Sequence, residues 1–206
     1  PGKTPSGIII EFVEKRETDF EQIYDVVHLK ASIHVPPGAS VNRYSVIKGE
    51  CHISQNVLVA QRAYLEDAWM GKGANAQENC YISHSRLEGL DVTAHGAKII
   101  NSTLGEKIFV AFNCFLNGKT GARIEIGGDC IIMPHTIIDA DEPITIPDNH
   151  LVWGFIGSQD DLRTNSISLD ELEKMTEVTL GNMSFNGEGK VFVDAFRKRF
   201  EHILEL

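Results

Sequence analysis

The sequence lacks the features by which several classes of protein are recognised. It has no run of about 18 apolar residues, so no segment has the length and apolarity that a membrane-spanning helix requires. Lys and Arg together number only 19, against 29 Asp and Glu, and the basic residues are scattered along the chain. Because nucleic-acid binding depends on clustered positive charge, the formal net charge of −10 argues against a nucleic-acid partner.

Cysteine is also scarce. The four cysteines, Cys51, Cys80, Cys114 and Cys130, have no CxxC spacing. They lie in the repeat region described below, where cysteine often serves as a small core hydrophobe. This usage, together with the lack of a signal-peptide pattern, predicts a reducing, cytoplasmic setting.

What the sequence does have is an aliphatic residue that returns at every sixth position. The residues in phase are Val35, Val41, Ile47, Ile53, Val59 and Leu65, then Leu104, Val110 and Leu116, and then Ile126, Ile132 and Ile138. A helix repeats its apolar face every 3.6 residues and a strand every 2, so a period of six belongs to a repeat of short units. Hexapeptide periods are typical of a β-solenoid, in which each strand and turn forms one side of a three-sided coil.

This pattern resembles the hexapeptide-repeat superfamily. The resemblance implies a left-handed parallel β-helix, and the catalytic members of the superfamily are mostly acyltransferases and γ-class carbonic anhydrases, usually trimers. We therefore expect an all-β solenoid that forms a homotrimer and acts on a small-molecule substrate. Small or turn-forming residues, among them Gly38, Gly49, Asn56, Gly71 and Gly105, are expected at the corners, where a positive φ is often needed. An ordinary β-sandwich of short strands is the alternative.

The chain divides into three predicted parts. Residues 1–29 would form an N-terminal leader and cap, residues 30–157 the β-helix, and residues 158–206 a C-terminal helical segment. In the last part Ser168 and Glu171 stand in a capping-box pattern at the start of a helix. After a predicted loop at 181–189, residues 191–206 predict an amphipathic helix whose apolar side includes Phe192 and Phe196. We expect this helix to lie along a solenoid face or across a subunit boundary.

One stretch interrupts the aliphatic repeat. From residue 71 the sixth positions are Gly71, Gln77, Ser83, Gly89, His95 and Asn101. Two explanations are open. Either these residues point into a cleft between subunits, or the phase of the repeat has shifted.

Within this stretch the chain resembles the γ-class carbonic anhydrases. That family carries an Asn-x-Gln motif, a histidine six residues after the Gln, and later a His-x4-His pair. Asn75-Ala76-Gln77 matches the first motif, and His95 stands where the first histidine of the pair is expected. The resemblance implies CO2 hydration at zinc, or at iron or cobalt in its place, held by three imidazoles with one open position. Gln77 would orient the bound water and Asn75 would support Gln77.

Two of the three expected histidines are replaced. Ile100 stands five residues after His95, and Ser83 stands six residues after Gln77, with His84 one place later. Since successive strand residues face opposite ways, His84 would need a bulge to reach the site.

The predicted metal ligands are therefore His95, His84 and His135, the last contributed by a neighbouring subunit. The predicted catalytic residues are Gln77, Asn75 and His95. A carboxylate could replace the third imidazole. The alternative is that His95 is a hydrogen-bonded histidine at a turn and that His84 lies on the surface.

A second possible function is acyl transfer. Hexapeptide acyltransferases use a lone histidine as general base, while an acyl-CoA donor lies along the groove between subunits. His95, followed by the small residues Gly96 and Ala97, would suit that role and needs no second histidine. Lys119 and Arg123 are the candidates for contacting the donor's phosphates. A third possibility is a non-catalytic scaffold or small-molecule binder, as in relatives of the carbonic anhydrases that have lost metal ligands.

Overall fold

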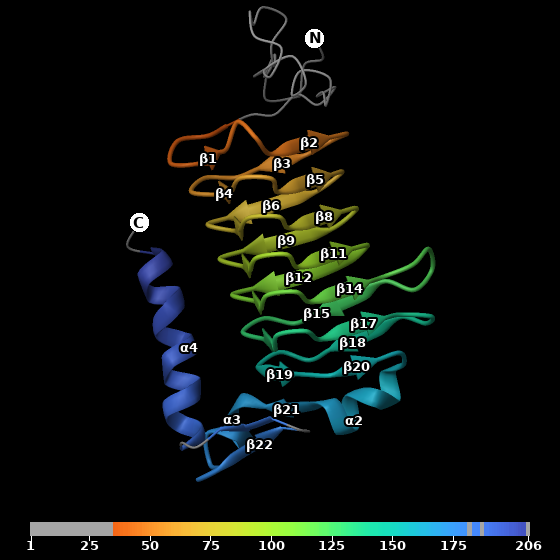
Figure 1. Ribbon diagram of the computed structural model, residues 1–206, viewed down its shortest axis with the longest axis vertical. Coiled ribbons are helices and arrows are strands. Elements are labelled where there is room, and N and C mark those ends of the chain that lie inside the picture. The colour runs from red at the N-terminus through yellow and green to blue at the C-terminus, as the bar shows by residue number, and fades with distance from the viewer. Residues whose placement is uncertain (1–34, 181–182, 186–187, 205–206) are drawn as a thin grey trace, which may run out of the picture.

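A stack of triangular coils forms the body of the protein. The computed structural model of the 206-residue chain describes residues 35–180, 183–185 and 188–204. Figure 1 shows short strands rising coil upon coil, with one long helix alongside. The strands of the stack run from residue 40 to residue 156, within the predicted range of 30–157, whereas the predicted leader and cap at 1–29 lie outside the described residues.

Three sheets form the three sides of this left-handed β-helix. Successive strands step from one sheet to the next, so neighbours within a sheet are three strands apart along the chain. Sheet A contains β1 (Ser40–Val41), β4 (Leu58–Val59), β7 (Asn75–Ala76), β10 (Val92–Thr93), β13 (Phe109–Val110), β16 (Ile131–Ile132) and β19 (His150–Val152). Sheet B contains β2 (Val46–Lys48), β5 (Tyr64–Glu66), β8 (Tyr81–Ser83), β11 (Lys98–Ile100), β14 (Phe115–Asn117), β17 (Ile137–Asp139) and β20 (Phe155–Ile156). Sheet C contains β3 (His52–Ile53), β6 (Trp69–Lys72), β9 (Arg86–Gly89), β12 (Ser102–Glu106), β15 (Ile124–Ile126) and β18 (Ile144–Ile146).

The core consists of three columns of inward side chains, one column for each sheet. The column of sheet A contains Val41, Val59, Ala76, Thr93, Val110, Ile132 and Val152. The column of sheet B contains Ile47, Leu65, Ile82, Ile99, Leu116, Ile138 and Ile156. The column of sheet C contains Ile53, Met70, Leu87, Leu104, Ile126 and Ile146. All except Val41 are buried, which explains the aliphatic period of the sequence.

The interruption of the repeat is a change of phase. Between sheets B and C, three successive sides are five residues long instead of six, running from Leu65 to Met70, from Ile82 to Leu87 and from Ile99 to Leu104. After each short side, the inward residues come one position earlier than a strict six-residue period predicts. Gln77 therefore falls one place after an inward residue and His95 two places after. Of the two explanations, a shifted phase is confirmed.

The corners between sheets contain residues in the left-handed backbone conformation. At the corner between sheets B and C these are Gly49, Asp67, His84 and Asn101, with φ from +45° to +70°. The expected corner glycines are only partly confirmed. Gly71 and Gly105 lie inside β6 and β12, and a Cβ on Gly71 would come within 1.9 Å of the Glu88 carbonyl oxygen.

The chain covers the last coil with a different kind of structure. β21 (Ser166–Ser168) pairs with β19 in antiparallel direction, and α2 (Leu162–Asn165) lies beside β20. At sheet C a side chain takes the place of a strand. The Gln159 amide, in the 3-10 helix η1 (Gln159–Asp161), accepts from the Thr145 N–H at 2.8 Å and donates to the Thr145 carbonyl at 2.9 Å. Backbone groups of sheets A and C are thus engaged at this end, and α2 lies beside the last strand of sheet B.

Two helices follow this cap. The predicted capping residue Ser168 accepts a hydrogen bond from the Glu171 N–H at 3.2 Å, which starts α3 (Leu169–Leu172) as expected. The predicted loop at 181–189 is instead partly a hairpin of β22 (Val178–Leu180) and β23 (Met183–Phe185). None of the described helices is long and apolar enough to cross a membrane.

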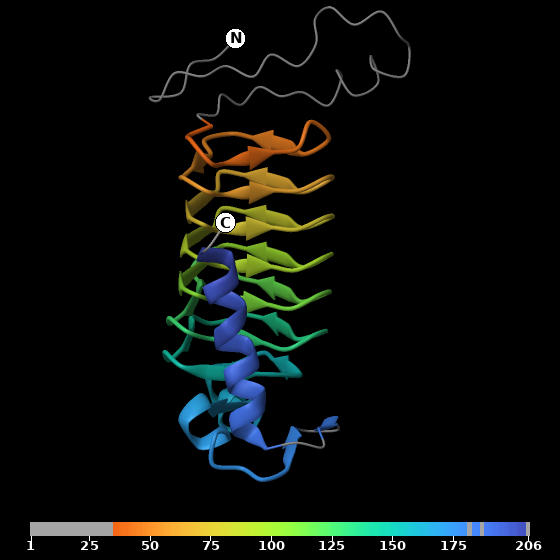
Figure 2. The same ribbon diagram turned by 90° about the vertical axis from the view of Figure 1, so that its left-hand side faces the viewer.

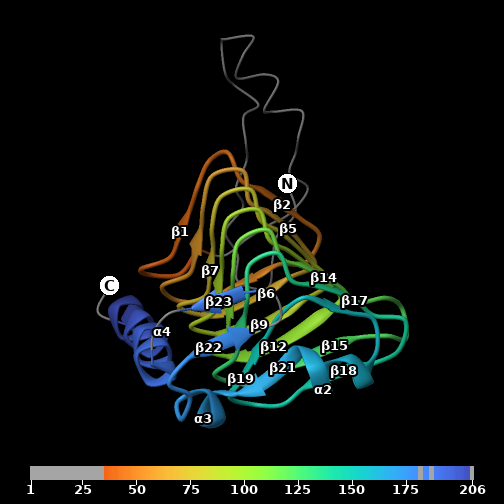
Figure 3. The same ribbon diagram turned by 60° about the horizontal axis from the view of Figure 1, so that its bottom comes forward.

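The second helix, α4 (Gly189–Leu204), runs back along the stack, as Figures 1 and 2 show. Phe196 meets Phe109 of sheet A edge-to-face at 5.3 Å between ring centroids, and Phe192 packs beside Phe196. Figure 3, which looks toward the capped end, shows α4 outside the triangular coils. The prediction that this helix lies along a solenoid face is confirmed.

Candidate functional site

The corner between sheets A and B, here called the A–B edge, carries His95. Glu78, His95 and Phe112 occupy the same place in three successive coils. His95 is exposed over 62% of its side chain, and its Nδ1 lies 2.8 Å from Oε2 of Glu78. A carboxylate that accepts the Nδ1–H fixes the ring and the tautomer, which leaves Nε2 as the free acceptor. This arrangement suits a general base.

His135 lies on the same edge, two coils further along the stack. Its ring meets Phe112 edge-to-face at 5.5 Å between centroids, so Phe112 stands between His95 and His135. Since neighbouring strands are about 4.8 Å apart, the two histidines are separated by roughly 10 Å of stack. Of the small residues next to His95, Gly96 is half-buried with a φ of +72°, whereas the Ala97 side chain is buried.

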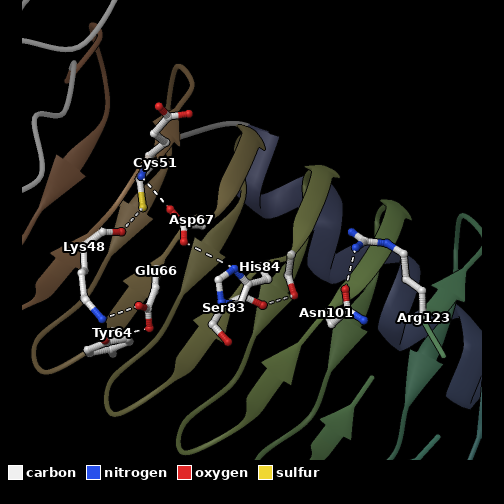
Figure 4. Close-up of polar contacts among 11 residues, drawn as sticks. Lys48, Cys51, Tyr64, Glu66, Asp67, Ser83, His84, Asn101 and Arg123 are labelled. Carbon is white, nitrogen blue, oxygen red and sulfur yellow. Dashed lines mark hydrogen bonds and ion pairs between the residues drawn. The ribbon is translucent and has the colours of Figure 1, made fainter. Parts of the chain in front are cut away.

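The corner between sheets B and C, here called the B–C edge, carries His84. Its Nδ1 lies 3.4 Å from Oδ2 of Asp67 in the preceding coil, and Oδ1 of Asp67 accepts the Glu50 N–H at 2.8 Å. Figure 4 shows Asp67, His84, Asn101 and Arg123 in a row along this edge. His84 takes the left-handed conformation at its corner and its side chain is exposed.

An open groove of about 320 Å³ follows the B–C edge. It is lined by Glu50, His52, Asp67, Ala68, Trp69, His84, Ser85, Arg86 and Arg123. The Trp69 ring is covered on both faces, because His52 stacks on it at 3.6 Å and the Arg86 guanidinium lies 4.3 Å from its centroid. Arg86 is also paired through two hydrogen bonds with Glu88. Trp69 therefore offers a ligand only its edge.

Lys119 and Arg123, the predicted phosphate contacts, differ in their surroundings. Lys119 pairs with Asp141 at 2.6 Å and with Asp139 at 3.0 Å, and these hydrogen bonds raise its pKa. Its charge is already compensated. Within the described residues Arg123 instead donates only to neutral acceptors, namely Oγ1 of Thr103 at 2.8 Å, Oδ1 of Asn101 at 2.9 Å and the Ser102 carbonyl at 3.1 Å.

The three predicted metal ligands do not meet within one chain. His84 lies on the B–C edge, whereas His95 and His135 lie apart on the A–B edge. Among residues 35–180, 183–185 and 188–204, no group of three or more His, Cys, Asp and Glu side chains could hold a metal ion. The arrangement in one subunit does not fit the three-imidazole site. A site completed by a second chain stays a prediction.

Asn75 and Gln77, predicted to act together, are also not hydrogen-bonded to each other within the described residues. Asn75 is in β7 of sheet A, and its buried Oδ1 has no hydrogen-bond partner in the described chain. Gln77 lies beyond β7 at the A–B edge. Within the described residues no hydrogen bond links the two side chains, so the expected support of Gln77 by Asn75 is not seen.

The carboxylate partners of the two histidines were missed in the sequence, although a signal for them exists. The separation in sequence from Glu78 to His95 equals the separation from Asp67 to His84. It is also the length of a coil that contains one five-residue side, here called a shortened coil, so residues at this spacing lie side by side in adjacent coils. A search for charged pairs at the length of a shortened coil would have found both.

The cysteines have no part in a reactive site. All four are free and buried, and loss of solvent raises the pKa of Cys51 and Cys130 to about 11 and that of Cys80 and Cys114 to about 12. They stay protonated at neutral pH and pack as small apolar residues. The prediction for their role is confirmed.

Comparison with known proteins supports the fold. No family model and no curated protein matches the chain. Among solved structures the chain is similar to one described as "putative acetyltransferase from Desulfovibrio desulfuricans G20", with 54% identity and a TM-score of 0.79. The fold is that of a hexapeptide-repeat β-helix. The match covers 89% of this chain but 39% of the Desulfovibrio protein, so this chain spans about two fifths of that protein's length.

Proposed function

We propose that this protein is an acyltransferase in which His95 is the general base. The observation that carries the proposal is the 2.8 Å pair of His95 Nδ1 and Glu78 Oε2 on an exposed edge. The 54% identity to a protein described as an acetyltransferase supports acyl transfer over CO2 hydration. Acyl transfer needs one histidine, whereas CO2 hydration at a metal would need ligands from a second chain.

The chemistry follows from the free ring nitrogen. Nε2 of His95 takes the proton from an acceptor hydroxyl or amine, and the acceptor then attacks the thioester carbonyl of acyl-CoA. The new C–O or C–N bond forms as the C–S bond breaks, and the imidazolium returns its proton to the leaving thiolate. Glu78 orients the ring and stabilises the imidazolium during the reaction.

The outer face of sheet B supports the predicted homotrimer. Its outward side chains include Tyr64 and Tyr81, stacked at 4.7 Å between centroids, together with Ile137 and Phe155. Ile137 is 39% exposed and Phe155 is 60% exposed, and the two lie side by side on this face. Sheet B lies between the A–B edge and the B–C edge. A second copy bound to sheet B would therefore form a groove between subunits beside these edges, where the acyl-CoA donor would lie.

The test is an acetyl-CoA assay that detects released CoA thiol with a panel of amine and hydroxyl acceptors. We expect His95→Asn to lower kcat by about 10²- to 10⁴-fold, the usual contribution of a general base. Glu78→Gln should lower kcat less, with little change in the KM for acetyl-CoA. His150→Asn, at the capped end of the stack, is the matched control. Retention of full activity by His95→Asn would remove His95 from the mechanism.

Metal-dependent CO2 hydration is the second candidate. It is tested by elemental analysis of the untagged protein for zinc, iron and cobalt, followed by a CO2 hydration assay. Stoichiometric metal that is lost in His95→Asn would favour this reaction over acyl transfer.

A further inference from the structure

The groove along the B–C edge carries opposite charges at its two ends. Glu50 lies at one end and Arg123 at the other. Within the part of the chain that the structure describes, neither side chain forms an ion pair. Between them lie Asp67 and His84, which are paired with each other.

Arg123 is held in a way that leaves it ready for an anion. Three of its N–H groups donate to Thr103, Asn101 and the Ser102 carbonyl, and none of these acceptors carries a charge. A guanidinium has five N–H donors in a fixed plane, so two remain for a ligand. Its position is set in advance, while its positive charge is uncompensated by any described carboxylate.

The other end of the groove is negative. Oδ1 of Asp67 accepts the Glu50 N–H and Oδ2 faces His84, so Asp67 is engaged on both oxygens. The Glu50 carboxylate is exposed and remains available. Arg86, which also lines the groove, is neutralised by Glu88 and does not alter this polarity.

The length of the groove follows from the stack. Glu50, Asp67, His84 and Asn101 follow one another at intervals of one shortened coil, so they lie in successive coils. At about 4.8 Å per coil, these three intervals place Glu50 roughly 14 Å from Asn101, whose Oδ1 the Arg123 guanidinium contacts.

We propose that this groove binds a zwitterionic small molecule, with its ammonium group at Glu50 and its carboxylate or phosphate group at Arg123. A simple anion would pair with Arg123 alone, and a simple cation would pair with Glu50 alone. A molecule of about 10 Å with both charges satisfies both ends. The site lies on a different edge from His95, so it stands or falls separately from acyl transfer.

The test uses isothermal titration calorimetry on the full chain with 4-aminobutyrate, 6-aminohexanoate and 8-aminooctanoate. The last has charged ends about 10 Å apart when extended. Octanoate and octylamine carry the same alkyl chain with one charge each. We expect affinity to rise with length among the amino acids, and 8-aminooctanoate to bind at least about tenfold more tightly than either single-charge probe.

Two substitutions locate the binding. Arg123→Gln and Glu50→Gln should each weaken 8-aminooctanoate binding by about tenfold, whereas Arg163→Gln on α2 should leave it unchanged. Glu50→Gln removes no described side-chain contact, so it keeps the test valid if Arg123→Gln lowers the melting temperature. The proposal is overturned if no amino acid binds, if octanoate or octylamine binds as tightly, or if Glu50→Gln binds like the wild type.

Discussion

Replacement of Thr93 by Val should stabilise the protein. Thr93 is fully buried in the core column of sheet A, between Ala76 and Val110. Its Oγ1 is buried and has no hydrogen-bond partner in the described chain. Val has the same branched shape, so the substitution exchanges an unsatisfied hydroxyl for a methyl group without opening a cavity.

The size of the effect comes from the desolvation of the hydroxyl. An unpaired buried hydroxyl costs about 1–3 kcal/mol, and Val recovers this free energy. For a chain of this size 1 kcal/mol shifts the melting temperature by roughly 2–4 °C. We therefore expect Thr93→Val to raise the melting temperature by several degrees, measured by circular dichroism at neutral pH.

Thr136 provides the matched control. It is also fully buried, but its Oγ1 donates to the Met133 carbonyl at 2.7 Å. Thr136→Val removes this hydrogen bond, although the Met133 carbonyl still accepts from the Thr136 N–H and from the Cys114 thiol, so its melting temperature should fall. If both variants shift in the same direction, or if Thr93→Val melts below the wild type, the reasoning about the unpaired hydroxyl is refuted.

Three further predictions follow from burial and packing. Burial raises the pKa of Asp91 well above its usual range, so the stability that Asp91 contributes is largest at low pH and is lost as the pH rises through the folded-state pKa. The melting temperature of the wild type relative to Asp91→Asn should therefore rise as the pH is lowered from about 8 to about 5. A difference that stays constant over this range would contradict the argument. Phe196→Ala should lower the free energy of unfolding by roughly 1–3 kcal/mol, because it removes the ring packed on Phe109, and denaturant unfolding will measure this. Phe155→Glu should reduce the mass seen by light scattering if sheet B joins copies; an unchanged mass would count against that face.

Much of the fold could be predicted because the inward residues of the core columns produce a six-residue period of aliphatic residues in the sequence. Ile47, Leu65 and Ile138 keep the six-residue period wherever a side has its full length. The stretch after Leu65 defeats the same rule, because a corner can lose one residue while the strands on either side keep their inward side chains. Local periodicity therefore identifies the coils but not the place where their phase changes.

The candidate site was harder to predict for the same reason. His95 was identified as a base, but its partner Glu78 lies in the preceding coil and is recognised only once the length of the shortened coil is known. The metal reading assumed that His84 and His95 face one cleft. They lie on different edges, because the eleven residues from His84 to His95 span about two of the three sides of a coil. Arg123 was singled out in the sequence only for its charge. That its described hydrogen-bond acceptors are all neutral could be seen only in the structure.

The covering of the last coil has a consequence for how the molecule behaves in concentrated solution. An open coil presents unpaired N–H and C=O groups that can recruit another strand and start a fibre. Here β21 pairs with the last strand of sheet A in antiparallel direction. At sheet C the Gln159 amide is hydrogen-bonded to the N–H and the carbonyl of Thr145. Parallel pairing by a second solenoid is therefore blocked on sheets A and C at this end, by one short strand and a single side chain.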